Sequence, residues 1–133
     1  MDNLSKYDVA VIGGGIAGSC AAIACAKEKQ SVILIEKNGF LGGALTAGGV
    51  GPMSTFYAGD TKIVGGVADE ILDEMNRTGF RTYVINDTGY PYSICYSSEG
   101  LKIALENLCI KYGVSILYHS TLVGVETENE EIK

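Results

Sequence analysis

Three glycines near the start of the chain have the spacing of a phosphate-binding turn. Gly13, Gly15 and Gly18 match the pattern G-x-G-x-x-G. In this pattern the first glycine permits a tight turn, the second lets the backbone approach a pyrophosphate, and the third lets a helix pack closely on a strand. A helix beginning near Ile16 would direct free N–H groups and the positive end of its dipole at the phosphate. These residue types and their spacing predict a site for the pyrophosphate of a dinucleotide.

A carboxylate further along the chain has the position of a ribose ligand. Glu36 directly follows the apolar run Val32 to Ile35. It lies about 20 residues beyond the glycines, where an acidic side chain can accept hydrogen bonds from ribose hydroxyls. Because a carboxylate repels a 2′-phosphate, Glu36 favours adenosine with a free 2′-hydroxyl.

The glycines and the carboxylate need a strand, a helix and a second strand to bring them together. Apolar residues 9–12 predict a short buried strand of a parallel sheet. Small residues over 16–29 predict a helix that packs closely on this sheet, and residues 31–36 predict the second strand. A chain with 18 glycines matches the glycine pattern easily by chance. The strand–helix–strand context is what makes the match specific.

The rest of the chain continues with helices and strands after a long loop. Residues 37–66 are rich in glycine, but their apolar and aromatic side chains argue against disorder, and loops of such length are usually functional. Capping residues, turn residues and apolar periodicity predict the remaining elements. They are a helix over 67–78 ended by Gly79, hairpin strands over 81–85 and 92–96 with their turn at 86–89, a helix capped by Ser97 or Ser98 and ended by Gly113, strands over 114–118 and 122–126, and a turn at Asn129.

These elements place the chain in the α/β class, with a Rossmann-like doubly wound parallel sheet followed by the start of a β-meander. Doubly wound sheets usually have five or more parallel strands, whereas this pattern contains three, so we expect an incomplete sheet. Residues 1–133 would then be one dinucleotide-binding domain at the N-terminus of a longer protein. The alternative is a small complete domain whose last hairpin closes on itself. An incomplete sheet would leave an open edge beside residues 9–12, through which the chain could self-associate.

Composition and charge exclude several classes of function. The net charge is −6, which argues against nucleic acid and against an anionic membrane surface, because both need a basic face. The single histidine and the spacing of the four cysteines suggest no metal site. We interpret the cysteines as reduced thiols of a cytoplasmic protein.

Three segments give the chain a resemblance to a known group. They are DVAVIGGGIAG with VILIEK, then GFLGGALTAGGVGP, and finally SEGLKIALENLCIKYGVSILYHSTLVGVE. Together they resemble FAD-dependent oxidoreductases with the glutathione-reductase-like Rossmann fold, over nearly the whole chain. The resemblance implies that the chain is the FAD-binding part of a flavin-dependent oxidoreductase acting on a small-molecule substrate.

The resemblance also implies roles for individual residues. Pyrophosphate would be held by Gly13, Gly15, Ile16, Ala17 and Gly18. The adenosine ribose would be bound by Glu36, with Lys37 beside it, and adenine by the backbone of Leu122. The path to the isoalloxazine ring would be lined by Gly43, Ala44, Leu45 and Thr46. No catalytic acid or base emerges, since Tyr57, Tyr90, Tyr92 and His119 are candidates by residue type alone.

Family members continue for several hundred residues, with a substrate domain and a later segment that binds the ribityl part of the flavin. We therefore expect turnover to need more than these 133 residues. Two other functions remain open on the sequence. One is an NAD-dependent dehydrogenase domain, because the fingerprint alone does not separate the two cofactors. The other is a non-catalytic nucleotide-binding module.

Overall fold

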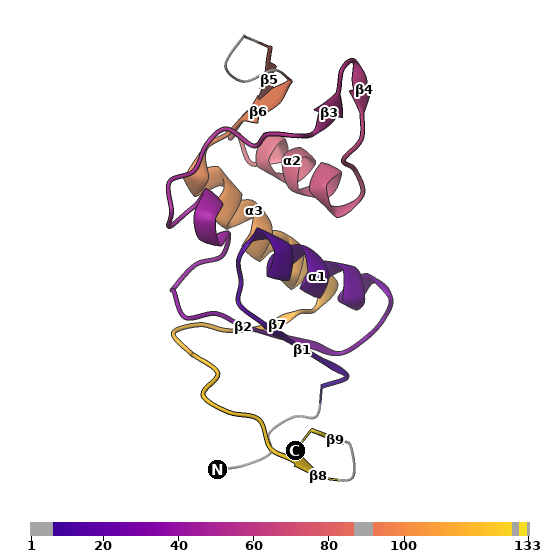
Figure 1. The fold of residues 1–133 in the computed structure, drawn as a ribbon, viewed down its shortest axis with the longest axis vertical. Coiled ribbons are helices and arrows are strands. Elements are labelled where there is room, and N and C mark those ends of the chain that lie inside the picture. The colour runs from indigo at the N-terminus through magenta and orange to yellow at the C-terminus, as the bar shows by residue number, and fades with distance from the viewer. Residues whose placement is uncertain (1–6, 87–91, 129–130, 133) are drawn as a thin grey trace.

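The structure is a computed structural model that describes residues 7–86, 92–128 and 131–132. Figure 1 shows α1 and α3 on one side of a small parallel sheet, with α2 beyond them. The elements are β1 Val9–Ile12, α1 Ile16–Lys27, β2 Val32–Ile35, the 3-10 helix η1 Gly43–Leu45, β3 Tyr57–Ala58, β4 Thr61–Lys62, α2 Val67–Arg77, β5 Tyr83–Ile85, β6 Ser93–Cys95, α3 Ser98–Tyr112, β7 Ser115–Leu117, β8 Thr127–Glu128 and β9 Glu131–Ile132.

The parallel sheet has the strand order β1-β2-β7. Val11 pairs with Leu34, and Leu34 pairs with Ile116, so these side chains share the face that packs against the helices. Side chains alternate between the two faces of a strand. Ile12 and Leu117 therefore point to the opposite face, where they are 49% and 46% exposed. This sheet and its strand order confirm the predicted α/β fold of Rossmann type.

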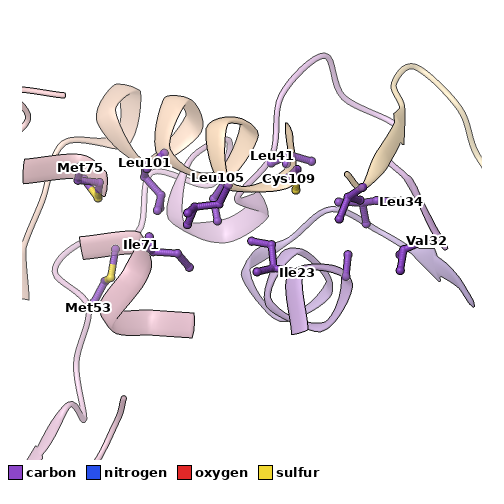
Figure 2. Packing of buried hydrophobic residues seen from close by; sticks show 14 of the residues in the cluster. Ile23, Val32, Leu34, Leu41, Met53, Ile71, Met75, Leu101, Leu105 and Cys109 are labelled. Carbon is purple, nitrogen blue, oxygen red and sulfur yellow. The ribbon is translucent and has the colours of Figure 1, made fainter. Parts of the chain in front are cut away.

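The hydrophobic core lies between the sheet and the helices. Figure 2 shows Ile23 of α1 facing Leu105 and Cys109 of α3, with Leu34 of β2 beside them. All four side chains are fully buried. Burial of a leucine or isoleucine side chain stabilises a protein by about 1.5–3 kcal/mol. The core therefore fixes the distance between α1 and the sheet, and with it the position of the glycine turn that joins them.

Local signals set the ends of the two later helices. The Ser97 hydroxyl accepts a hydrogen bond from Gly100 N–H at 3.2 Å and caps α3, as predicted. Gly113 ends α3 with φ 77°, a left-handed conformation that glycine adopts without a steric cost. Gly79, with φ 91°, follows α2 in the same way.

The predicted loop over 37–66 contains short regular elements. The 3-10 helix η1 interrupts it, and β3 and β4 pair as an antiparallel hairpin. Apolar residues of the loop anchor it to the core, among them Leu41, Met53 and Phe56. Farther along the chain, the Tyr96 hydroxyl lies 2.8 Å from the carbonyl oxygen of Leu45 and also contacts that of Val50. One tyrosine thus holds both ends of the segment that follows η1.

The predicted strand over 122–126 is wrong. These residues have no regular structure, and Val123 is 99% exposed. A strand needs a neighbouring strand or an apolar surface, and none of the described residues provides one here. The antiparallel pair forms later, between β8 and β9. Strands β5 and β6 form the predicted hairpin, whereas most of its turn and the expected turn at Asn129 lie outside the described residues.

The helices of the described ranges are too short or too polar to cross a bilayer.

Candidate dinucleotide-binding site

The glycine turn between β1 and α1 is fixed by backbone hydrogen bonds. Gly13 has φ +94°, and its N–H donates to the carbonyl oxygen of Ile35 at 2.8 Å. The Ser19 hydroxyl donates to the carbonyl oxygen of Gly14 at 3.1 Å. The helix begins after Gly15, and no side chain caps its first turn. The free N–H groups of that turn are the donors that an anion such as a pyrophosphate accepts.

The glycines of the turn differ in what surrounds them. A Cβ on Gly18 would lie 1.9 Å from the carbonyl oxygen of Gly13, and one on Gly14 would lie 2.5 Å from Leu41 Cδ2. A Cβ on Gly15 would meet no protein atom within 4 Å. Gly18 and Gly14 are therefore needed for packing, while Gly15 borders open space at the helix N-terminus.

Glu36 is buried beneath the turn, with 5% of its surface exposed. Its Oε2 accepts a hydrogen bond from Gly14 N–H at 2.6 Å. Its Oε1 accepts from Asn38 N–H at 2.8 Å and from Asn38 Nδ2 at 2.7 Å. A carboxylate has about four acceptor positions, and these three hydrogen bonds leave one of them over. The structure thus adds a second role for Glu36, which is to hold the glycine turn against β2.

A second glycine loop lies against the first. Gly42 forms an isolated parallel bridge with Gly15, and Gly42 N–H donates to the carbonyl oxygen of Gly14 at 2.8 Å. A Cβ on Gly43 would lie 2.9 Å from Gly15 Cα. The Thr46 hydroxyl closes the loop by donating to the carbonyl oxygen of Leu41 at 2.8 Å. Gly42 and the predicted residue Gly43 therefore adjoin the glycine turn directly, and the predicted residues Ala44, Leu45 and Thr46 follow them in and after η1.

An apolar pocket of about 460 Å³ opens beside these two loops. Three predicted site residues lie in its wall, namely Ile16, Ala17 and Leu45. Burial raises the pKa of the Cys20 thiol, which also lines the pocket, so this group stays neutral at pH 7. The remaining lining residues are Val50, Pro52, Met53, Ser54, Phe56, Val64, Ala68, Ile71 and Leu72. The lining contains no charged residue, and the pocket therefore suits an apolar ring system.

Two predicted site residues stand apart from this arrangement. Lys37 is exposed. Leu122 is 43% exposed in the segment without regular structure, so it is not the strand residue that the sequence predicted. The resemblance assigned adenine to its backbone, and this role stays a prediction.

The residues that were catalytic candidates by type differ in what they contact in the structure. Tyr92 donates a hydrogen bond to Asp60, which raises the pKa of the Tyr92 hydroxyl, and its ring lies 5.8 Å from that of Tyr57. His119 lies two residues beyond the end of β7, and Tyr90 is outside the described residues. Within the described ranges, no three His, Cys, Asp or Glu side chains form a group that could hold a metal ion.

Sequence reasoning missed Asn38, Gly14 and Tyr96. Asn38 and Gly14 hold the Glu36 carboxylate, and Tyr96 holds the segment after η1. The sequence does contain a signal for Gly14, because it lies between two fingerprint glycines at a position where the fingerprint accepts any residue. Asn38 and Tyr96 carry no such signal, since their contacts depend on tertiary structure.

The fold and the site define a dinucleotide-binding domain of Rossmann type. A strand, a glycine turn, a helix and a second strand follow one another, and the Glu36 carboxylate after the second strand accepts a hydrogen bond from the turn. A family model described as FAD dependent oxidoreductase matches residues 8–133. The chain belongs to this family, and its cofactor is FAD.

Comparison with individual proteins agrees with this fold. A 42-residue segment is 52% identical to a cinnamate reductase of Clostridium sporogenes and covers 32% of this chain and 6% of the reductase. The L-proline dehydrogenase of P. horikoshii aligns at TM-score 0.64 and 18% identity over 97% of this chain and 48% of that one. The glycine oxidase of Bacillus cereus aligns at TM-score 0.55 and 18% identity over 96% of this chain and 50% of that one. The chain thus spans about half the length of these solved structures.

Proposed function

We propose that this chain is the part of a flavin-dependent oxidoreductase that holds FAD across the carboxyl edge of its parallel sheet. The pyrophosphate would lie at the N-terminus of α1, and the adenosine at the ends of β2 and β7. The flavin ring would lie on the side of Leu45, toward the apolar pocket. The observation that carries this proposal is the open space at Gly15, at the uncapped N-terminus of α1 and next to Gly14, whose Cβ position is filled by protein atoms.

The residues present fit each part of this cofactor. Gly15 leaves room for a pyrophosphate beside uncapped N–H groups. Glu36 keeps one acceptor position for a ribose hydroxyl. The apolar lining of the pocket matches the low polarity of a ring system and would keep water away from it.

Bound FAD would supply the hydride and electron transfer of the reaction. The described residues would bind and orient the cofactor. Helix α1 would hold the pyrophosphate and Glu36 would fix the ribose, while Tyr96 holds Leu45 and Val50, which line the pocket. The substrate would be a small molecule.

Titration of the purified chain with FAD, ADP and NAD tests this proposal. We expect FAD and ADP to bind, and a yellow chain with the absorbance band of oxidised flavin after loading. Quenching of FAD fluorescence and calorimetry measure the two affinities. Binding of NAD in preference to FAD would favour the dehydrogenase alternative. Binding of neither FAD nor ADP would refute the proposal.

We also propose that the protein works in the cytoplasm, apart from nucleic acid and membranes. The net charge of −6 and four cysteine side chains without a disulfide support this proposal. Self-association through the free side of β1 is a further proposal, supported by the exposure of Ile12. Fractionation of cells and sedimentation with anionic vesicles and DNA test the first statement.

A further inference from the structure

The segment that follows β7 is tied to the segment that follows β2. Glu36 N–H donates to the carbonyl oxygen of Leu117 at 2.9 Å, and Ser120 N–H donates to that of Glu36 at 3.0 Å. His119 N–H donates to the carbonyl oxygen of Asn38 at 3.3 Å. Asn38 also donates two hydrogen bonds to the Glu36 carboxylate. One residue therefore links His119 with the predicted ribose ligand, at the sheet edge where ligands of parallel α/β sheets bind.

The His119 ring has a defined place on this edge. A Cβ on Gly39 would lie 2.9 Å from Cε1 and 3.0 Å from Nε2 of His119, so the ring lies against the bare backbone of Gly39. His119 has φ 54°, a left-handed conformation that is uncommon for a residue with a side chain. Neither ring nitrogen has a hydrogen-bond partner among the residues that the structure describes, and the side chain is exposed.

We propose that His119 binds the adenosine half of the nucleotide, opposite Glu36. This inference rests on the proposed FAD function and adds a specificity residue to it. The ties through Asn38 and Gly39 hold the imidazole at the ends of β2 and β7. There its free nitrogens can bond a ribose hydroxyl or an edge of adenine, and its face can stack on the base.

Two variants separate ligand binding from packing. Asparagine is enriched in the left-handed region, so His119→Asn removes the ring while it keeps the backbone. Gly39→Ala keeps the imidazole but displaces the ring, because the added Cβ would lie too close to it. We expect each variant to bind ADP at least fivefold more weakly than the unmodified chain. Calorimetry should show unchanged affinity for inorganic pyrophosphate, which lacks the adenosine.

The chain has one histidine, so its ring protons give a single assignable set of NMR signals. On addition of ADP to the unmodified chain, we expect these signals to shift and to show nuclear Overhauser contacts with ribose or adenine protons. Unmoved ring signals at saturating ADP, or equal ADP affinity of His119→Asn and the unmodified chain, would refute the role of His119 while FAD binding stands. Failure of the unmodified chain to bind ADP and FAD would refute both proposals.

Discussion

At the scale of single residues, the structure separates two glycines of the turn that serve packing from Gly15, which borders free space at the N-terminus of α1. Gly14 and Gly18 are surrounded by Leu41, Glu36 and the backbone of Gly13. Gly15 has a φ of −64°, which alanine adopts readily, and free space where a Cβ would lie. Substitutions at these positions should therefore act on different properties, folding in one case and ligand binding in the other.

Gly15→Ala should weaken ADP binding at least tenfold, about 1.4 kcal/mol, because the methyl group takes the space that the pyrophosphate needs. The melting temperature should stay that of the unmodified chain. Calorimetry with ADP and thermal unfolding measure the two effects. Gly65→Ala is the matched control, since Gly65 is exposed and a Cβ there meets only the carboxylate end of Asp69. Unchanged ADP affinity of Gly15→Ala would contradict the pyrophosphate site.

Glu36 should discriminate between nucleotides that differ at the 2′ position. A 2′-phosphate would face a buried carboxylate, whereas a free hydroxyl can donate a hydrogen bond to it. We expect ADP to bind the unmodified chain about tenfold more tightly than 2′-phospho-ADP. Both ligands carry the same diphosphate, so the difference isolates the ribose. Equal affinities in a competition titration would show that Glu36 serves only to hold the turn.

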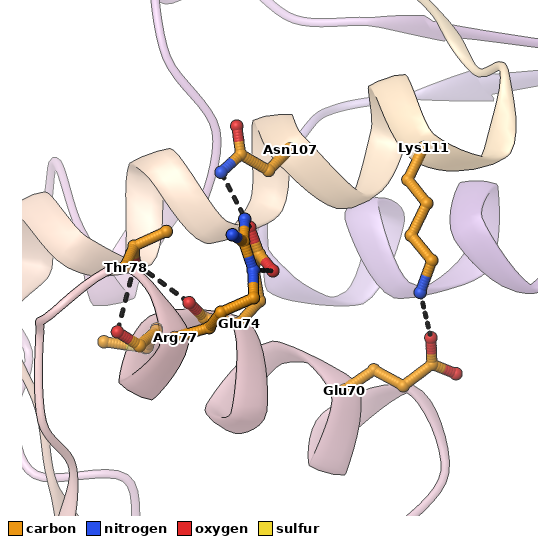
Figure 3. A network of polar contacts seen from close by, with 7 residues as sticks. Glu70, Glu74, Arg77, Thr78, Asn107 and Lys111 are labelled. Carbon is orange, nitrogen blue, oxygen red and sulfur yellow. Dashed lines mark hydrogen bonds and ion pairs between the residues drawn. The ribbon is translucent and has the colours of Figure 1, made fainter.

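At the scale of elements, two carboxylates of α2 join the helices that carry the site. Glu70 accepts hydrogen bonds from Lys27 of α1 and from Tyr112 of α3, and it lies 3.9 Å from Lys111 Nζ. One turn later, Glu74 accepts from Arg77 at 2.7 and 2.6 Å and from Asn107 Nδ2 of α3 at 2.7 Å (Figure 3). These contacts fix α2 against α3 and so shape the wall of the apolar pocket.

Glu74 should make stability depend on pH in the acid range. Its bonds to Arg77 and Asn107 lower the pKa of its carboxyl from 4.5 to about 2. The folded state thus holds this proton more weakly than the unfolded chain, so the stabilisation is present above pH 4.5 and is lost as the pH falls through the folded pKa. Because Arg77 is largely exposed, we expect about 1 kcal/mol.

Urea unfolding of Glu74→Gln and the unmodified chain at several pH values measures this contribution. The free energies of unfolding should differ at pH 6 and converge toward pH 2. Asp73→Asn is the control, because Asp73 is an exposed neighbour on the same helix. A constant difference at all pH values would assign the effect to lost packing instead of charge.

At the scale of the whole molecule, one face of the sheet is covered by helices and the other is open among the described residues. Ile12 and Leu117 lie on the open face, and β1 pairs with β2 on one side alone within the described chain. Exposed apolar surface and a free strand edge favour association with other chains. Because this apolar surface stays exposed, folding of a monomer buries less apolar area, and the monomer is less stable.

The isolated chain should therefore self-associate at micromolar concentration. Size-exclusion chromatography with light scattering measures its mass, and Ile12→Lys should shift the equilibrium toward the 14.0 kDa monomer, because a charge on the edge strand opposes pairing. Val123→Lys is the control, since Val123 is exposed outside the sheet. A monomeric unmodified chain that retains FAD through the column would contradict this prediction.

The sequence by itself determined the strand–turn–helix unit and the order of the later helices. Those features depend on local physics, namely the apolar period, the capping serine at Ser97, and glycines where φ is positive. The resemblance of three of its segments also indicated the FAD family, which the family model confirms, whereas the glycine fingerprint and Glu36 alone indicated only a dinucleotide. The predicted strand over 122–126 failed because strand formation depends on a partner that no local pattern reveals.

Tertiary structure alone decided which groups meet. Glu36 is buried under the glycine turn, where its carboxylate accepts two hydrogen bonds from Asn38. Tyr96 contacts carbonyl oxygens of the loop, and the His119 ring lies against Gly39. Some of these contacts join residues that lie far apart in the sequence, where helix and strand periodicity gives no prediction. The others depend on the geometry of a backbone turn that the sequence did not predict. These contacts form only once the helices and strands have packed together, and a local sequence pattern does not specify that packing.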